Sequence, residues 1–328
     1  MGDLTTFLST IGQEVEDADE ESFLLFSQDI PSSNLGFVDS KASTVEVTIH
    51  DREYTIHQSP TLLSSSRAQG TTGAVLWKIT PLFASWLSNT TSNPLWTNNI
   101  LTFSSTIVEL GCGISALTAL ALSPLLEPEC NGHYIATDQE YVHRLFRQNL
   151  QSNPPKAQSR NLSSSKPSKK GKRAQKASGS LSSQADTPHP HLNITFTSLD
   201  WETDHPETLK AQIVRGGERQ GETGDPGFDL LVSCDCIYNE ALIAPFVRTC
   251  AEIARLRPSP SSSRSESGSL RKPTVCVVAQ QQRSPDVFEA WLRETTRYFR
   301  VYRLNDEVLG ESLGVGSGYL VHGLVLRD

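Results

Sequence analysis

The stretch that decides the fold is Thr106-Ile-Val-Glu-Leu-Gly-Cys-Gly-Ile-Ser-Ala-Leu-Thr-Ala-Leu-Ala-Leu122. Its first five residues are typical of a short buried strand, and the apolar residues after Ser115 are typical of a helix that Ser115 can cap. The two glycines between them permit a tight turn and let a ligand approach the backbone near the free N–H groups of the helix. The spacing G-x-G-x-x-A is that of a dinucleotide fingerprint, although a tight turn without a ligand fits it as well.

Outward from this turn, strands and helices alternate along the chain. Further strands are expected at residues 133–137, 194–196, 228–234, 274–279, 298–304 and 319–326. Helices are expected at residues 116–122, 141–150, 241–255 and 285–296. This alternation predicts an α/β fold: a doubly wound, mostly parallel seven-strand Rossmann-like sheet with helices on both faces. Because the last two strands follow each other without a helix, we expect the final strand to be antiparallel.

Other parts of the chain lie outside this alternation. Residues 1–22 contain seven acids and no base, which predicts an acidic flexible tail. Residues 23–72 are expected to form an N-terminal β extension, a hairpin with its turn at Asp51-Arg52. The main domain then covers residues 73–328. Within it, residues 151–190 and 258–272 are expected to be flexible insertions, because they are rich in serine and poor in large apolar side chains.

The charge is unevenly distributed along the chain. The whole protein carries a net charge of −8, which argues against a general nucleic-acid binder. Residues 151–190 hold eight bases and one acid, a charge of +7, so the remainder carries −15. This segment predicts a weak contact with RNA or a nuclear address at Lys169-Lys-Gly-Lys-Arg173, and a solvated insertion without function explains it equally well.

The sequence also limits the compartment and the cofactor. We expect neither a secretory leader nor a membrane span, because acids interrupt the N-terminus and the longest apolar run is too short. The six cysteines are scattered, and Cys234 and Cys236 lack a second pair, so a metal site is not expected. Reduced thiols then predict a cytoplasmic protein, with a nuclear location also open. We expect a monomer.

Two acids at strand ends point to the kind of ligand. Glu109 lies two residues before Gly111, where a carboxylate would repel the pyrophosphate of a dinucleotide but suits a cofactor with positive charge, such as S-adenosylmethionine. Asp138 ends the next strand, where it can accept both hydroxyls of a ribose. A solvated strand-end glutamate and an N-cap for the following helix are the simpler explanations.

Two further motifs follow later strands. Asp200-Trp201 can frame an adenine, with the ring on the indole face and the carboxylate near the exocyclic amine, although a buried tryptophan beside a surface aspartate explains it too. Asp235-Cys-Ile-Tyr238 ends the fourth strand, at the sheet edge where ligands bind. There Asp235 is either a site residue or a cap for the helix at residues 241–255.

Together these residues resemble a known family. Glu109-Leu-Gly-Cys-Gly113, Asp138, Leu199-Asp-Trp201 and Asp235-Cys-Ile-Tyr238 are similar to the seven-β-strand protein lysine methyltransferases of the methyltransferase-like 21 group. Gly73-Ala-Val-Leu-Trp77 resembles the upstream tryptophan motif of that group, with Lys78 where its proline usually stands. The fungal ribosomal lysine N-methyltransferase 5 family shares the Ser-Cys-Asp-Cys-Ile-Tyr form of the fourth strand and the long Ser/Lys insertion.

The resemblance implies an activity and a set of roles. It implies transfer of a methyl group from S-adenosyl-L-methionine to a lysine of a protein, with a large-subunit ribosomal protein as the acceptor. Asp235 and Tyr238 would then face the acceptor lysine. The cofactor contacts expected from the resemblance and from the motifs above are Trp77, Glu109, Gly111, Cys112, Gly113, Asp138, Asp200, Trp201 and Cys234.

Three alternatives remain. A methyltransferase could act on another protein, a small molecule or a nucleic acid, although the Asn/Asp-Pro-Pro-Tyr type of motif is absent. A nicotinamide-dependent oxidoreductase is disfavoured by Glu109. A binding module without catalysis is disfavoured because both the acids and Tyr238 are present.

Overall fold

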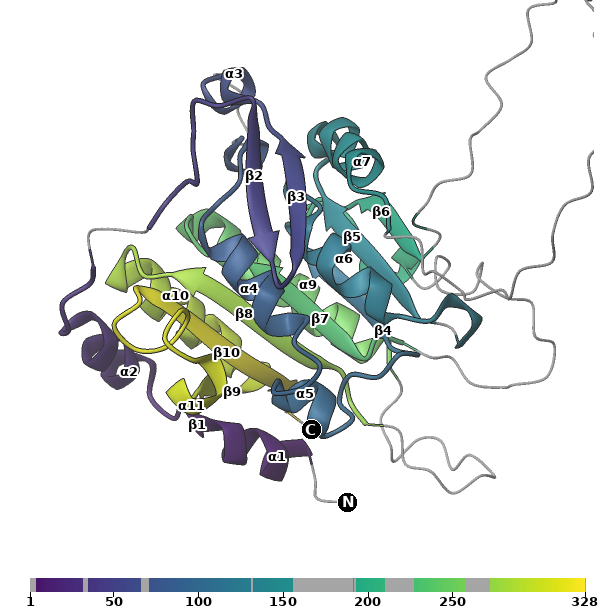
Figure 1. Ribbon diagram of the computed structural model, residues 1–328. Coiled ribbons are helices and arrows are strands. Elements are labelled where there is room, and N and C mark those ends of the chain that lie inside the picture. Colours follow the sequence, from purple (N-terminus) through teal and green to yellow (C-terminus); the bar gives the residue numbers. More distant parts are fainter. Residues whose placement is uncertain are drawn as a thin grey trace, which may run out of the picture.

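Residues Thr106–Leu110 form β4, which lies inside an eight-stranded sheet in the computed structural model of the chain (Figure 1). The structure describes residues 4–31, 35–65, 71–130, 132–155, 191, 193–209, 227–257 and 272–327. Most of the two expected insertions lies outside the described residues, and the predicted RNA contact and nuclear address lie there with them.

The sheet has the order β1-β9-β10-β8-β7-β4-β5-β6. Its strands other than β4 are β1 (Gly12–Glu14), β5 (His133–Asp138), β6 (Ile194–Ser198), β7 (Leu230–Cys234), β8 (Val275–Gln281), β9 (Phe299–Leu304) and β10 (Tyr319–Leu326). Strands β4 to β8 pair in parallel, whereas the final strand β10 runs antiparallel to both β8 and β9. The predicted doubly wound fold with an antiparallel final strand is therefore confirmed.

The strand order reverses beside β4, and this positions the site. From β4 the chain proceeds outward through β5 and β6, then returns to form β7 and β8 on the other side. Leu110 is level with Thr137 on β5 and with Ser233 on β7, so the three strands end together. In open α/β sheets, the crevice outside such a switch point is where ligands bind.

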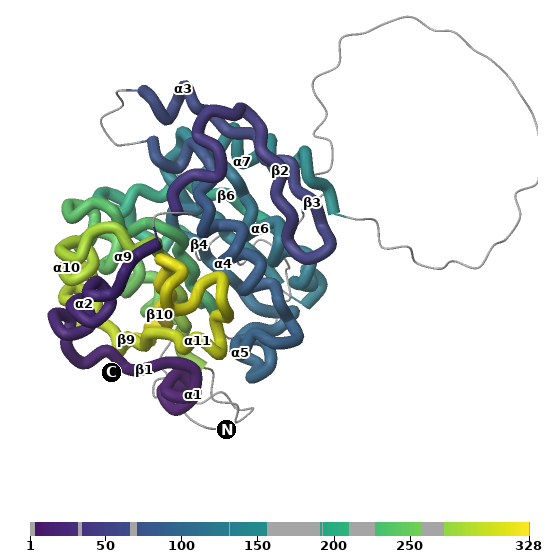
Figure 2. The backbone as a smooth tube through the Cα atoms, turned by 60° about the vertical axis from the view of Figure 1, so that its left-hand side comes forward, coloured from purple at the N-terminus to yellow at the C-terminus, as the bar shows by residue number. Residues whose placement is uncertain are grey.

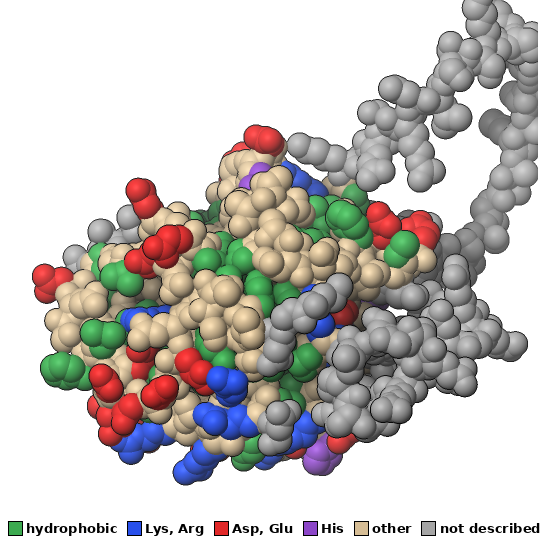
Figure 3. All heavy atoms as spheres, turned by 90° about the horizontal axis from the view of Figure 1, so that it is seen from below, with side chains coloured by type: hydrophobic (Ala, Val, Ile, Leu, Met, Phe, Trp, Pro, Cys, Tyr) green, Lys and Arg blue, Asp and Glu red, His purple; other side chains and the backbone are tan. Residues whose placement is uncertain are grey.

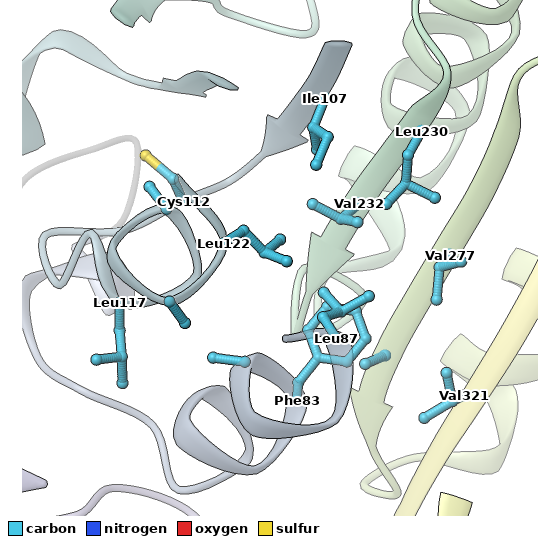
Figure 4. Close-up of a cluster of buried hydrophobic side chains, with 14 of the residues drawn as sticks. Phe83, Leu87, Ile107, Cys112, Leu117, Leu122, Leu230, Val232, Val277 and Val321 are labelled. Carbon is cyan, nitrogen blue, oxygen red and sulfur yellow. The ribbon is translucent and has the colours of Figure 1, made fainter. Parts of the chain in front are cut away.

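Helices cover both faces of the sheet. On one face lie α4 (Ile79–Leu87), α6 (Leu117–Leu122) and α7 (His143–Ser152); on the other lie α2 (Ala18–Phe26), α9 (Ile243–Arg255) and α10 (Pro285–Thr296). Successive side chains of β4 point to opposite faces of the sheet. Ile107 therefore packs in the hydrophobic core on one face, and Val108 packs in the core on the other. Figure 4 shows Phe83 and Leu87 of α4 over Val232 and Val277 of the sheet.

The N-terminal hairpin forms a second, two-stranded sheet of β2 (Thr44–Ile49) and β3 (Arg52–His57). Its turn is at His50 and Asp51, one residue earlier than predicted, with His50 at φ 52°. The hairpin lies beside α7 (Figure 2), where the Asn149 side chain bonds both the N–H and the C=O of His57. The remaining short helices are α1 (Leu4–Ile11), α3 (Pro60–Leu63), α5 (Pro94–Thr97) and α11 (Asp306–Leu309).

The prediction of a flexible tail at residues 1–22 is wrong for the residues that the structure describes. Helix α1 buries Leu4 and Leu8, and β1 pairs with β9 as an edge strand, which makes eight strands instead of seven. Three of the seven acids have basic partners, since arginines of α10 and β9 pair with Asp19, Glu14 and Glu21. Viewed from below in Figure 3, acidic and basic side chains accordingly lie close together. Within the described ranges, no helix is both long and apolar enough to cross a bilayer.

Candidate active site

The turn after β4 is held open by backbone conformation. Gly111 and Gly113 have φ of +70° and +59°, and a Cβ on Gly111 would lie 2.3 Å from the sulfur of Cys236. Glycine at position 111 is therefore required. The N–H groups of Gly111 and Cys112 both donate to the carbonyl of Thr137 (2.9 and 3.1 Å), which fastens the turn to β5. Helix α6 begins at Leu117, and its N-cap residue is Ala116 (φ +55°), one residue later than the predicted cap Ser115. The Ser115 hydroxyl still accepts the N–H of Leu117 (3.3 Å).

Asp138 links the ends of β4 and β5. One carboxylate oxygen accepts the N–H of Gly113 (2.8 Å), and the other accepts the N–H of Gln139 (2.7 Å). Burial raises the pKa of this carboxyl to about 6, although both hydrogen bonds act to lower it. Gln139, not Asp138, occupies the N-cap position of the following helical turn, so the capping explanation for Asp138 does not hold. Each oxygen keeps one lone pair for a ligand.

Glu109 lies buried beneath α6, only 2% exposed. The Tyr134 hydroxyl on β5 donates to it over 2.9 Å. Burial raises the pKa of Glu109 to about 7, against the lowering effect of that hydrogen bond. The explanation of a solvated strand-end glutamate is therefore wrong.

Asp200 and Trp201 lie beyond the end of β6. The Trp201 ring packs edge-on against Phe246 of α9, with centroids 5.1 Å apart. Its buried indole N–H has no hydrogen-bond partner among the described residues. Asp200 is half-buried and accepts the N–H of Glu202 (2.9 Å). A buried donor in a pocket wall is costly unless a ligand accepts from it.

Asp235 follows β7 with a left-handed φ of +63°, a strained conformation that is uncommon outside glycine. Its side chain is 3% exposed and forms a two-pronged ion pair with Arg283, with both N–O distances at 2.5 Å. The N–H of Gln281 adds a third contact (3.2 Å). Asn239, not Asp235, caps the next helical turn, which removes the capping explanation. No motif in the sequence indicates the pairing of Asp235 with Arg283.

Trp77 and Tyr238 border the same region. The Trp77 indole N–H donates to the carbonyl of Thr72 (3.0 Å), and the Arg283 guanidinium lies 4.7 Å from its ring centre. The Tyr238 hydroxyl accepts from Thr72 (3.3 Å), and its side chain is partly exposed at the rim. The N–H of Lys78 donates to the carbonyl of Gly36 (2.8 Å), a bond that a proline could not make.

The structure brings all eleven predicted residues to one pocket. They are Trp77, Glu109, Gly111, Cys112, Gly113, Asp138, Asp200, Trp201, Cys234, Asp235 and Tyr238. Cys234 is half-buried in the pocket wall, with its sulfur 3.9 Å from the hydroxyl of Thr80. No cluster of three or more His, Cys, Asp or Glu side chains able to hold a metal occurs in the described ranges.

Arg283 and Tyr134 are the residues that the sequence analysis missed. Arg283 lies two residues beyond the end of β8, and the rule that ligands bind at carboxyl ends of strands could have singled it out. Tyr134 reads as a core aromatic in an apolar strand. It is level with Ile107 on β4, and only the paired strands show that its hydroxyl reaches Glu109, two residues further along β4.

Comparison with known proteins gives several fungal relatives. No protein-family model matches the chain. Ribosomal lysine N-methyltransferase 5 of Zygosaccharomyces rouxii is 29% identical over 250 residues, covering 73% of this chain and 69% of that protein. The protein of the same name from Candida glabrata is 27% identical over 75% of this chain and 70% of its own length.

A relative with a different name also matches. A Schizosaccharomyces pombe protein named diaminohydroxyphosphoribosylamino-pyrimidine deaminase is 26% identical over 91% of this chain. The chain spans only 56% of that protein's length. Zinc-dependent base deaminases carry a P-C-x-x-C motif, and no two cysteines of this sequence are three residues apart.

Two of the solved structures that match the chain are methyltransferases. The CurJ carbon methyltransferase matches 76% of this chain and 58% of its own, with 14% identity and a TM-score of 0.40. The glycopeptide N-methyltransferase MtfA, solved with S-adenosylhomocysteine, matches 71% of this chain and 87% of its own, with 10% identity and a TM-score of 0.37. These scores are too low to add to what the strand order itself establishes. The resemblance read from the motifs is confirmed: over about three quarters of its length, the chain is similar to the fungal ribosomal lysine N-methyltransferase 5 proteins.

Proposed function

We propose that the protein is an S-adenosylmethionine-dependent protein-lysine N-methyltransferase that modifies a large-subunit ribosomal protein. The observation that carries the proposal is the meeting of three carboxyl groups, Glu109, Asp138 and Asp235, in one pocket at the ends of β4, β5 and β7. The names of the fungal relatives support lysine and the ribosome as the target.

The residues of the pocket fit this cofactor. Asp138 has a free lone pair on each oxygen for the two ribose hydroxyls, and the partnerless indole N–H of Trp201 needs an acceptor. The absence of a side chain at Gly111 leaves the backbone open to close approach. Glu109 would become fully ionised beside the cationic part of the ligand, because an opposite charge lowers the pKa of a carboxyl. When bound, S-adenosylmethionine would supply a methyl group on a sulfonium.

The remaining residues would orient the acceptor. Methyl transfer is an in-line displacement, so most of the acceleration comes from alignment and exclusion of water. A lysine amine attacks only when neutral, and its free pKa of ~10.4 must fall in the site. Asp235 would accept a hydrogen bond from the amine and aim its lone pair, while Tyr238 at the rim would line the lysine channel.

A labelling experiment tests the proposal. The protein is incubated with S-adenosylmethionine carrying a tritiated methyl group and a hypomethylated fungal lysate. We expect a labelled protein band that co-purifies with large ribosomal subunits and yields methyl-lysine on hydrolysis. Label in nucleic acid or small molecules would support the alternative methyltransferases, and no label at all would contradict the proposal.

Asp235→Ala is the matched variant. It should abolish labelling, while calorimetric titration still shows cofactor binding, because the residue contacts the acceptor side of the pocket. Full activity in this variant would rule out the role assigned to Asp235.

A further inference from the structure

The contact between Arg283 and Asp235 is more than surface pairing. Arg283 projects from the loop between β8 and α10, and its two terminal nitrogens each meet one oxygen of the buried Asp235 carboxylate at 2.5 Å. The guanidinium also covers the Trp77 ring at 4.7 Å. One side chain thus joins the tips of β7 and β8 to the loop that precedes α4.

The carboxylate retains capacity for one more donor. Two oxygens offer about four lone-pair positions. Oδ1 accepts from Arg283 and from the N–H of Gln281, whereas Oδ2 accepts from Arg283 alone among the described contacts. A free position therefore remains on Oδ2. The contact with Arg283 therefore leaves one acceptor position of Asp235 unused among the described contacts.

We propose that Arg283 is a positioning residue for methyl transfer: it fixes the Asp235 carboxylate and balances its charge, so that the acceptor lysine can lose its proton beside it. This inference rests on the proposed function. A lone carboxylate within about 4–6 Å would raise the pKa of the amine by about 1–3 units and hold it in the unreactive ammonium form. A carboxylate and a guanidinium together form a pair with no net charge. The carboxylate of such a pair can still accept a hydrogen bond.

The other titratable groups near the pair leave a pH range in which this effect can be measured. Burial raises the pKa of the neighbouring thiols and phenols, which are Cys234, Cys236, Tyr238 and Tyr319. The pKa values of Glu109 and Asp138, raised to about 7 and about 6, lie at the acidic side. Lysine deprotonation is therefore followed on the alkaline side of neutrality, with the cofactor saturating.

The experiment compares Arg283→Met with Arg283→Lys. Methionine keeps an apolar side chain against Trp77 but removes the charge, whereas lysine keeps the charge and loses the two-pronged geometry. Rates of tritium transfer to the protein band labelled by the wild type are measured against pH. For Arg283→Met we expect the acidic limb of the profile to move up by about 1–3 pH units. For Arg283→Lys we expect a lower rate, with the acidic limb of the pH–rate profile at the same pH as in the wild type.

The outcomes separate the inference from the proposed function. A wild-type protein that labels no protein contradicts the proposed function, and the inference with it. If the wild type labels a protein but the Arg283→Met profile does not move, whatever the rate, only the inference is overturned. It is overturned also if Arg283→Lys moves as far as Arg283→Met, or if Arg283→Met is faster than the wild type. Calorimetric titration with S-adenosylmethionine and thermal unfolding show whether both variants are folded.

Discussion

Replacing Glu109 by glutamine tests whether burial governs the charge of the pocket. The side chain is 2% exposed, and the hydrogen bond that its carboxylate receives from Tyr134 can equally go to the amide oxygen of glutamine. Glutamine therefore reproduces the protonated carboxyl in shape and charge. Any difference in stability between the two proteins should depend on pH.

The magnitude follows from the raised pKa. The pKa of Glu109 moves from 4.5 to about 7 on folding, so the folded state holds the proton more tightly than the unfolded state. The stability that this provides is fully present below pH 4.5 and is lost as the pH rises through 7. At ~1.36 kcal/mol per unit, the full loss is about 3 kcal/mol. The free energy of unfolding of Glu109→Gln, measured relative to that of the wild type, should therefore rise by about 2–3 kcal/mol between pH 5 and pH 8.

Urea unfolding without cofactor, at pH 5 and pH 8, measures this difference. Glu53→Gln, at an exposed position on β3, is the control and should show no such change. An equal difference in unfolding free energy between wild type and Glu109→Gln at both pH values would refute the raised pKa of Glu109. Saturating S-adenosylmethionine should stabilise the wild type more than the variant at pH 8, since only the wild type has a carboxylate to pair with the positive charge of the cofactor.

Three further substitutions test other contacts. Gly111→Ala should cost about 2–4 kcal/mol, because left-handed strain adds to the collision with Cys236, whereas Gly316→Ala, at φ +81° with open space around it, should cost only about 1–2 kcal/mol; equal losses in denaturant unfolding would contradict this. Tyr134→Phe should destabilise the protein by about 1.5–3 kcal/mol more at pH 8 than at pH 5, and a pH-independent loss would show that Glu109 does not use this bond. Arg257→Ala removes the partner of Asp229 (2.5 Å) and should cost about 2–4 kcal/mol in urea unfolding, below the range for fully buried pairs because Asp229 is 28% exposed; a loss under about 1 kcal/mol would place the pair among ordinary surface pairs.

Much of the fold could be predicted because local patterns determine it. Helix α10 and strand β10 have the predicted bounds, since Ser284 and Pro285 mark the helix start and an apolar run marks the strand. The N-terminal residues could not be predicted in this way. Their acids suggested a solvated tail, but Glu14 pairs with Arg300, which lies 286 residues further along the chain. Composition cannot reveal a partner that distant.

The candidate site could likewise be predicted only in part from the sequence. Glycines in a strand-to-helix turn and acids at strand ends are readable because parallel strands bring their carboxyl ends to one edge. From that rule alone, the sequence predicts that Asp138 and Asp235 lie near each other. It could not show that Asp235 meets Arg283, because this depends on the course of the loop after β8.

The sequence by itself determined the alternation of strands and helices, the open turn at Gly111 and the set of residues at the sheet edge, because these depend on the spacing of neighbouring residues. Only the tertiary structure decided that β1 is added at the edge of the sheet, that Glu109 is buried against Tyr134, and that Asp235 forms an ion pair with Arg283. Those outcomes depend on burial and on contacts between distant segments, and both arise only once the layers have packed together.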